Sequence, residues 1–374
     1  MKPYSVDKFA QQVLHGEKVF VLDVRKEEDV EDWKIEGSSV EFVNIPFEEV
    51  ENDVKGVKEK LPTDKKIITV CYRGVSSQEA AKLLQEEGLQ DITYLENGMA
   101  GWSEHLEPVK VGDLSDGGEI YQFIRLGKGC LSYMIVSDGE AAVVDANRMI
   151  GAYKKFAEEK NLNIKHVIDS HLHADHISGG RLLADDNAAT YWFPPKDDEG
   201  MKLPFEVLIE DVEIEFGNQK VKVLPLYSPG HTKGSTSFIV DDAYLLTGDI
   251  LFVESIGRPD LAGKADEWVN DLYTTLHERY TSLTDQLYVL PGHFGKMNEI
   301  NKEKHVGAKM KDIYKQNEQL KVTDKDEFHH MVTDNLPPQP NSHQEIRKTN
   351  LGKQKVDEEE KREMELGPNR CAVS

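Results

Sequence analysis

The sequence contains very little cysteine. Its 374 residues include only three, Cys71, Cys130 and Cys371, and an odd number at such wide spacing provides no framework of disulfides. We therefore expect a cytoplasmic protein with reduced thiols, in which each cysteine is available as a nucleophile.

Long apolar stretches are missing as well. The first fifteen residues contain Asp7, Lys8 and two glutamines where a signal peptide needs an unbroken apolar segment. No later run approaches the ~18 apolar residues of a membrane-spanning helix. We expect neither secretion nor insertion into a membrane.

Basic residues are fewer than acidic residues. The chain carries 45 Lys and Arg against 68 Asp and Glu, which gives a formal net charge of −23. This balance argues against nucleic acid or an anionic membrane as a partner. An anionic substrate would therefore have to meet local positive charge.

Apolar residues are plentiful, at 39% of the chain, and the length suits two domains better than one. Short apolar strands alternate with helical stretches from residue 18 to residue 94, which predicts a parallel sheet. We expect residues 1–105 to form a first α/β domain. The polar residues 106–119, which include glycine and proline, are predicted to be a linker.

A longer series of apolar strands follows, with helical stretches between some of them. It predicts a second α/β domain over residues 120–321, whose sheets are sandwiched by helices. Residues 322–374 form a C-terminal extension rich in proline and charge, a composition typical of disorder. Its final turn and cysteine are features that a solvated tail does not need, and we expect it to wrap over the second domain and shape a substrate pocket.

Cys71 stands at the end of the apolar stretch IITV, and a helical run begins at about Ser76. A thiolate in a loop that opens a helix faces unsatisfied backbone N–H groups and the positive end of the helix dipole, which together favour the anionic form. Arg73 adds positive charge. A buried cysteine followed by an ordinary loop would explain the spacing equally well.

The motif CYRGVSSQEAAKLL, with Asp23-Val24-Arg25 and NGMAGW, resembles rhodanese-type sulfurtransferases over roughly residues 4–105. The resemblance implies that Cys71 carries sulfane sulfur as a persulfide, that the loop amides of residues 72–77 hold it, and that Arg73 assists. The stretch WKIEGSSVEF stands where the family usually has His-Ile-Pro-Gly-Ala, which predicts a modified loop there.

Metal-ligand residue types gather after the apolar strand HVIDS. His171, His173, Asp175 and His176 fall within six residues. Because imidazoles and carboxylates are costly to bury without partners, this spacing predicts a metal site.

Three further candidates each follow an apolar stretch, and loops at one end of a layered α/β fold converge on a common cleft. They are His231, Asp249 and His293.

These seven positions resemble the H-x-H-x-D-H fingerprint of the metallo-β-lactamase superfamily and its lone His, Asp and His, over about residues 118–300. The fold class is therefore expected to be α/β, with a rhodanese-like parallel-sheet domain followed by a metallo-β-lactamase αββα sandwich. The resemblance implies two metal positions that share Asp249. The first would use His171, His173, His231 and Asp249, and the second Asp175, His176, Asp249 and His293.

Two chemistries of this superfamily suit the chain. Mononuclear iron persulfide dioxygenases use a 2-His-1-carboxylate triad, here His171, His231 and Asp249, with open positions for oxygen and substrate. Zinc hydrolases such as glyoxalase II use two metal ions to activate a bridging water. The fused sulfurtransferase and the stretch GRPD favour the dioxygenase.

We therefore expect one Fe²⁺ and a low-molecular-weight persulfide that is oxidised to sulfite and thiol. Arg258 would bind the anionic substrate, and Asp260 would orient the Arg258 side chain. The other interpretation of Arg258 is a structural ion pair. Two Zn²⁺ with hydrolysis is the alternative function, and a non-catalytic persulfide relay or sensor is a third. The sequence leaves open the thiol carrier, direct sulfur exchange between the sites, and whether the chain forms a homo-oligomer.

Overall fold

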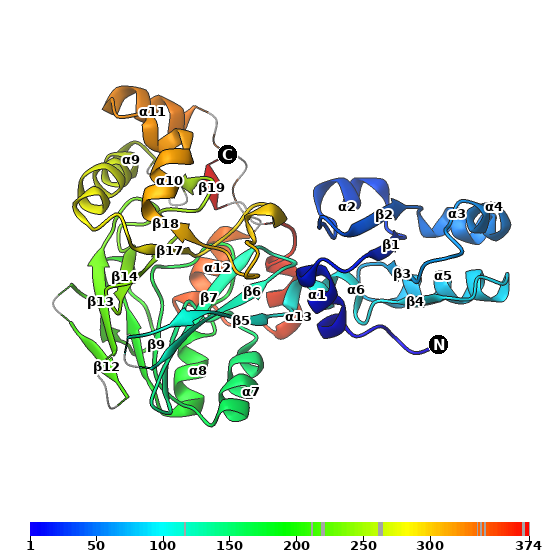
Figure 1. Cartoon of the computed structure of the whole chain (residues 1–374), viewed down its shortest axis with the longest axis horizontal. Helices are drawn as coiled ribbons and strands as arrows, with labels where there is room; N and C mark the ends of the chain where they lie inside the picture. The colour runs from blue at the N-terminus through cyan, green and yellow to red at the C-terminus, as the bar shows by residue number, and fades with distance from the viewer. Residues whose placement is uncertain are drawn as a thin grey trace. The chain divides into compact units, whose positions relative to one another are not determined.

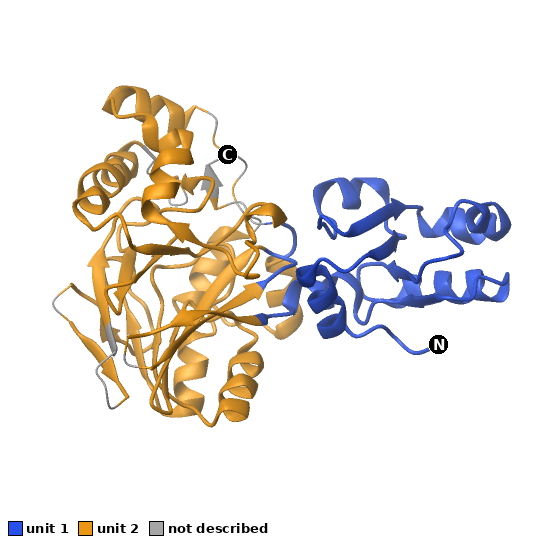
Figure 2. Cartoon of the chain, viewed as in Figure 1, with its two compact units in different colours: residues 1–107, 125–128, 366–368 blue, residues 108–124, 129–365, 369–374 orange. Residues whose placement is uncertain are grey.

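The computed structural model describes residues 1–115, 117–210, 212–217, 221–260, 265–334, 336, 339, 342–368 and 371–373. The chain divides into two compact units (Figure 2). The first contains residues 1–107, 125–128 and 366–368, and the second contains residues 108–124, 129–365 and 369–374. None of the helices in the described part of the chain combines the length and apolar character needed to cross a bilayer.

The first unit contains a four-stranded parallel sheet in the order β2-β1-β3-β4 (Figure 1). Its strands are β1 (Val19–Asp23), β2 (Val40–Asn44), β3 (Ile67–Val70) and β4 (Ile92–Tyr94). Its helices are α1 (Val6–His15), α2 (Glu27–Asp32), α3 (Phe47–Asn52), α4 (Val54–Glu59), α5 (Val75–Glu86) and α6 (Gly98–Glu104). Because β3 is an inner strand and buried along its whole length, it presents its carboxyl end rigidly.

Strand β2 occupies part of the stretch that was predicted to be a modified loop. It is the edge strand of the sheet, its side chains are only half-buried, and its register pairs Val19 with Val40. The prediction rested on the departure from the family's His-Ile-Pro-Gly-Ala stretch, and this change of sequence does not prevent the edge strand from pairing.

The second unit contains two larger sheets. One has seven strands in the order β11-β10-β9-β8-β7-β6-β5, and the other has six in the order β12-β13-β14-β15-β17-β18. The strands of the first are β5 (Glu107–Asp113), β6 (Glu119–Arg125), β7 (Cys130–Ser137), β8 (Glu140–Val144), β9 (Asn163–Ile168), β10 (Thr190–Phe193) and β11 (Glu206–Val207). Those of the second are β12 (Ile214–Phe216), β13 (Val221–Tyr227), β14 (Thr236–Val240), β15 (Tyr244–Gly248), β17 (Tyr288–Pro291) and β18 (Ala308–Lys309).

Helices cover the outer faces of these sheets, as a sandwich requires (Figure 1). Tyr153 of α7 packs against Phe123 of β6, and Leu272 of α9 and Ile313 of α10 share a core with Val289 of β17. The helices are α7 (Ile150–Lys160), α8 (Gly180–Asn187), α9 (Ala265–Thr274) and α10 (Met310–Gln316), with short turns at Pro195–Asp197, Thr275–Arg279, Tyr280–Ser282, Met297–Glu299 and Glu318–Lys321. The predicted fold class is confirmed.

The prediction of a linker was wrong for the residues of β5. This segment is the edge strand of the seven-stranded sheet and its side chains are mostly half-buried. Its glycine and proline suggested a loop, but both residues are compatible with a strand that has one free edge.

The C-terminal extension is largely helical in its described part. It contains α11 (Lys325–Thr333), α12 (His343–Asn350), α13 (Glu358–Met364) and β19 (Ala372–Val373), which pairs with β16 (Ile256–Gly257). Phe328, Ile346 and Leu351 are at most 2% exposed. A few well-spaced apolar residues therefore order a segment whose average composition is typical of disorder.

Candidate functional site

Cys71 follows β3 at the carboxyl end of the first unit's sheet. Its side chain is 6% exposed, and its Sγ accepts a hydrogen bond from the backbone N–H of Gly74 at 3.2 Å. Gly74 has a φ of 88°, a left-handed conformation that strains other residues, and α5 begins directly after it. The loop therefore brings the N-terminus of α5 to the thiol.

Arg73 is exposed, with its guanidinium carbon 5.6 Å from the centre of the Tyr72 ring. An exposed cation beside the cysteine loop can meet an incoming anion. In the Asp23-Val24-Arg25 motif, Arg25 forms a buried ion pair with Asp23 at 2.7 Å and donates a hydrogen bond to the carbonyl of Trp33. Trp33 begins the stretch that departs from the family pattern, so this hydrogen bond ties that stretch to the motif.

Three ligand-type side chains converge in the second unit from the ends of three strands. His171 follows β9, His231 follows β13 and Asp249 follows β15. His171 Nε2 and His231 Nε2 lie 3.7 and 3.5 Å from Asp249 Oδ2, and all three side chains are buried. This group, which we name the first position, contains the three residues of the predicted triad.

Hydrogen bonds orient the two imidazoles of the first position. His231 Nδ1 lies 2.9 Å from the carbonyl oxygen of Arg258, which can only accept, so Nδ1 carries the proton. His171 Nδ1 lies 2.8 Å from Ser170 Oγ, whose own hydrogen is donated to Asp145 Oδ2 at 2.9 Å. Each Nε2 is therefore left with its lone pair available for a metal ion.

The residues of the first position fit a divalent metal ion. His171 Nε2, His231 Nε2 and Asp249 Oδ2 are buried without a hydrogen-bond partner. Burial holds the pKa of His171 well below its ordinary value and lowers that of His231, so both rings are neutral. Burial would raise the pKa of Asp249, but the neighbouring histidines, His293 foremost, outweigh it and lower that pKa. A bound cation would satisfy all three orphaned atoms.

Asp175, His176 and His293 form a second group, and Cys130 joins them. Burial and Asp175 would raise the pKa of the Cys130 thiol, but His293 and His176 lower it to about 7. Sequence reasoning treated Cys130 only as a free thiol, because nothing in its local sequence indicates a ligand. We name these four residues the second position.

Cys371 also lies at this centre, grouped with Asp249 and His293. Burial raises the pKa of its thiol well above the ordinary value. The backbone carbonyl of Cys371 accepts a hydrogen bond from the N–H of Arg258 at 3.2 Å. In the sequence, the only signal of this position was a cysteine at the end of a polar extension.

His173 has different neighbours from those predicted. Its ligand atoms group with Asp145 and Asp169, and its Nε2 lies 3.3 Å from Asp145 Oδ1. The resemblance implied that His173 shares a position with His171, His231 and Asp249. The ring centroids of His171 and His173 are 4.2 Å apart, but His171 Nε2 lies beside Asp249 and His173 Nε2 beside Asp145.

Arg258 is completely buried and forms two hydrogen bonds to Asp260, from Nε at 2.6 Å and from Nη2 at 2.8 Å. Its backbone carbonyl also orients His231. This geometry supports the ion-pair interpretation of Arg258, and its predicted role in substrate binding stays a prediction.

The C-terminal extension packs against the loop that carries the ligands, as expected, and its role in shaping a substrate pocket stays a prediction. Asn350 of α12 donates to the carbonyls of His173 and His176 at 3.0 Å and accepts from Ser178 N–H at 3.0 Å. Glu365 accepts from Ile177 N–H at 2.7 Å. The sequence did not indicate either residue as part of the site.

Comparisons with known proteins agree with this arrangement. Residues 126–293 match the family model of the metallo-beta-lactamase superfamily, and residues 5–105 match that of the rhodanese-like domain. The chain is 31% identical over 186 residues to the probable metallo-hydrolase YqgX of Bacillus subtilis (strain 168), a match that covers 43% of this chain and 83% of that protein.

The chain is also 28% identical over 153 residues to the mitochondrial persulfide dioxygenase ETHE1 of Bos taurus, over 37% of this chain and 52% of that protein. Among solved structures, a metallo-beta-lactamase from Staphylococcus aureus subsp. aureus COL matches with a TM-score of 0.58 and 25% identity, over 64% of this chain and 74% of that chain.

Proposed function

Because the chain belongs to the metallo-beta-lactamase superfamily and also contains a rhodanese-like domain, we propose that it is a persulfide dioxygenase with a fused sulfurtransferase. The observation that carries the proposal is the occurrence of the His171, His231 and Asp249 triad in one chain with the Cys71 loop. Both sites suit sulfane sulfur, and the similarity to a protein named persulfide dioxygenase supports the pairing.

In the first unit, the Cys71 thiolate attacks the outer sulfur of thiosulfate. The new Cys71 S–S bond forms as the thiosulfate S–S bond breaks, and sulfite leaves with the electron pair. The N–H of Gly74, which already contacts Sγ, stabilises the anionic persulfide at the N-terminus of α5. A small thiolate then takes the outer sulfur, which yields a low-molecular-weight persulfide and restores Cys71.

In the second unit, a persulfide RSSH reacts with O₂ and water to give the thiol RSH, sulfite and two protons. Fe²⁺ held by His171, His231 and Asp249 would supply the activation of oxygen. In each imidazole Nδ1 carries the proton and donates it in a hydrogen bond, from His171 to Ser170 Oγ and from His231 to the Arg258 carbonyl, which fixes the ring orientation. All three ligand residues are buried, so they are shielded from bulk solvent.

Oxygen uptake tests this proposal directly. Iron-loaded protein given glutathione persulfide should consume oxygen and release an equal amount of sulfite, and His231→Ala should abolish both. Cys71→Ser should leave this reaction intact and abolish sulfur transfer from thiosulfate to cyanide. Absence of oxygen uptake, combined with thioester hydrolysis by zinc-loaded protein, would reject the dioxygenase.

A zinc hydrolase with an attached sulfurtransferase is the second candidate. The second group of buried ligands favours it, since two metal ions can activate a bridging water, and so does the similarity to a probable metallo-hydrolase. Metal analysis of protein purified without oxygen distinguishes the two functions, because iron at the first position supports the dioxygenase and zinc at both positions supports the hydrolase.

For the dioxygenase function, we propose small-molecule persulfides and thiols as the substrates and partners, and the cytoplasm as the location.

A further inference from the structure

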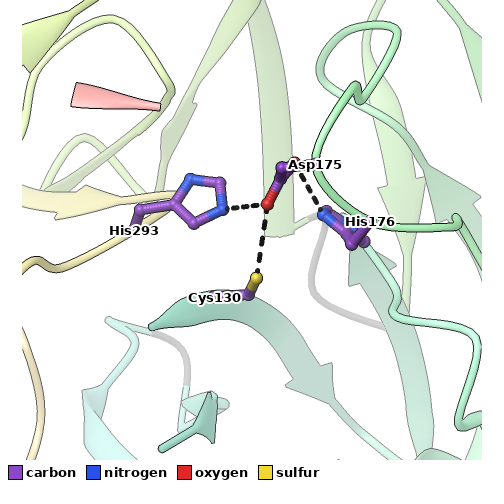
Figure 3. Close-up of side chains that lie close together, drawn as sticks. All are labelled: Cys130, Asp175, His176 and His293. Carbon is purple, nitrogen blue, oxygen red and sulfur yellow. Dashed lines mark hydrogen bonds and ion pairs between the residues drawn. The ribbon is translucent and has the colours of Figure 1, made fainter. Parts of the chain in front are cut away.

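Cys130 lies where a fourth ligand would complete the second position. Its Sγ and one ligand atom from each of Asp175, His176 and His293 all lie within 4.8 Å of one another. Sγ is 3.5 Å from Asp175 Oδ2, and His293 Nε2 is 2.9 Å from the same oxygen. Figure 3 shows the thiol and the two imidazoles around the carboxylate on different sides.

The backbone fixes Cys130 opposite His293. The two residues form an antiparallel bridge, with Leu131 N–H donating to the carbonyl of Gly292 at 2.8 Å and Phe294 N–H donating to that of Gly129 at 3.0 Å. The separation of the thiol from the imidazole is therefore set by paired chain segments, which is the rigidity that a metal site requires.

The imidazoles of His293 and His176 each hold Nδ1 close to a carboxylate oxygen of this centre. His293 Nδ1 lies 2.6 Å from Asp249 Oδ1, which leaves Nε2 for the second position in the usual carboxylate–histidine–metal arrangement. His176 Nε2 is buried without a hydrogen-bond partner. All four residues are at most 2% exposed, so a cation that bound their side chains would offset the cost of their burial.

We propose that the Cys130 thiolate completes the expected second position of Asp175, His176 and His293 as a closed site for a single Zn²⁺, separated from the first position by the carboxylate of Asp249. One sulfur, two nitrogens and one oxygen make the four-coordinate set that zinc takes where no position stays open. A thiolate selects against Mg²⁺, Ca²⁺ and Mn²⁺. The first position has three protein ligands and no sulfur. It therefore leaves coordination positions open and offers harder ligand atoms than the second position, whichever reaction it supports.

Cobalt substitution tests this site without any measurement of activity. Metal-free full-length protein is loaded with Co²⁺, and the near-ultraviolet charge-transfer band of a thiolate–cobalt bond is recorded. The chain has three cysteines, and the first position contributes none, so the band reports a cysteine ligand. We expect the band in the unaltered protein and its loss in Cys130→Ser.

Cys371→Ser is the matched control, because Cys371 is a second buried cysteine at the same centre. This variant and Cys71→Ser should keep the band. Absence of the band in the unaltered protein, or its persistence in Cys130→Ser with loss in Cys371→Ser, overturns the proposal. If Cys130→Ser does not fold, X-ray absorption of the unaltered zinc protein decides, since the proposal requires one Zn–S distance of about 2.3 Å.

Discussion

Three histidines of the metal centre, His171, His231 and His293, each form a hydrogen bond to a fixed neighbour through one ring nitrogen. The other ring nitrogen is then available to bind a metal ion. The neighbours are Ser170 Oγ, the carbonyl oxygen of Arg258 and Asp249 Oδ1. Such partners set the tautomer and the ring orientation of a metal ligand. At the scale of single residues, we therefore expect metal affinity to depend on groups that never touch a metal ion.

Replacing Ser170 with alanine should weaken metal binding at the first position by about 10- to 100-fold, because His171 loses the acceptor of its Nδ1 proton. Competition with a chromophoric chelator measures the affinity. Ser237→Ala is the control, since Ser237 is also buried and hydrogen-bonded, to Tyr280, but contacts no ligand. Equal affinities for the two variants would contradict the role given to Ser170.

Replacing Asp260 with asparagine should lower the free energy of unfolding by ~3–5 kcal/mol, because the buried Arg258 guanidinium loses its ion pair with Asp260. Denaturant titration of the variant measures this loss. The double variant with Arg258→Met should recover part of this loss, since the buried guanidinium that paired with Asp260 is then also removed. A loss under about 1 kcal/mol for Asp260→Asn would contradict a structural ion pair.

At the scale of elements, the C-terminal helices stabilise a loop that belongs to a distant part of the chain. Asn350 ends α12 and bonds to residues on both sides of the His173–His176 turn. Glu365, just after α13, accepts from Ile177 and pairs with Arg148. The extension thus supplies hydrogen bonds that the ligand loop cannot make internally.

Replacing Asn350 with leucine should lower the free energy of unfolding by about 2–4 kcal/mol, because three hydrogen bonds of roughly 1 kcal/mol each are lost and buried carbonyls are left unpaired. It should also weaken metal binding. Thr349→Ala removes one helix-surface hydrogen bond on the same helix and serves as the control for both measurements. Unchanged metal binding in the leucine variant would contradict the inferred support of the loop.

Three elements meet at Glu119 of β6, which pairs with Lys110 of β5 and Lys160 of α7. The hydrogen bond from Lys110 lowers the pKa of Glu119 to about 2. A lowered carboxyl pKa adds stability that is complete above the ordinary value of 4.5 and is lost as the pH falls through about 2.

Glu119→Gln should therefore destabilise the protein at pH 7 by at most about 1 kcal/mol, as is usual for ion pairs near the surface. The difference from the unaltered protein should shrink as denaturant titrations are moved from pH 5 toward pH 3. A difference that stays constant over this range would show that the charge of Glu119 is not the cause.

At the scale of the whole molecule, each unit has its own apolar core. Residues such as Leu22, Ile67 and Leu84 pack together in the first unit, and Leu245, Val289 and Phe328 share a core in the second. The ligand-type groups of the metal centre all belong to the second unit. Metal removal should therefore affect one unit only.

Treatment with a chelator should abolish the reaction of the second unit and lower its melting temperature, because bound metal stabilises the folded state by mass action. Transfer of sulfur from thiosulfate by Cys71 should continue. Cys71→Ser is the reciprocal variant, which should lose sulfur transfer and keep its metal content. Loss of sulfur transfer on chelation would show that the two units do not act independently.

Much of this molecule could be predicted from local sequence. The strands around Ile67 and Val289 are continuous apolar runs, and the predicted ligand residues stand where such runs end. A weak prediction was at an edge, as for β5, where a strand pairs on one side only and its side chains are mostly half-buried. Local pattern fails there because little apolar surface distinguishes an edge strand from a loop.

The sequence by itself determined the fold class, the cysteine loop and the residue types of a metal centre, because each follows from apolar runs along the chain and from the residue types that stand at their ends. Only the tertiary structure decided which atoms meet. Cys130 and His293 are far apart in the chain and come together through pairing of their backbones, and Cys371 reaches the centre through the bridge of its segment to Arg258. Such encounters depend on loop conformation and long-range pairing, which no local pattern encodes.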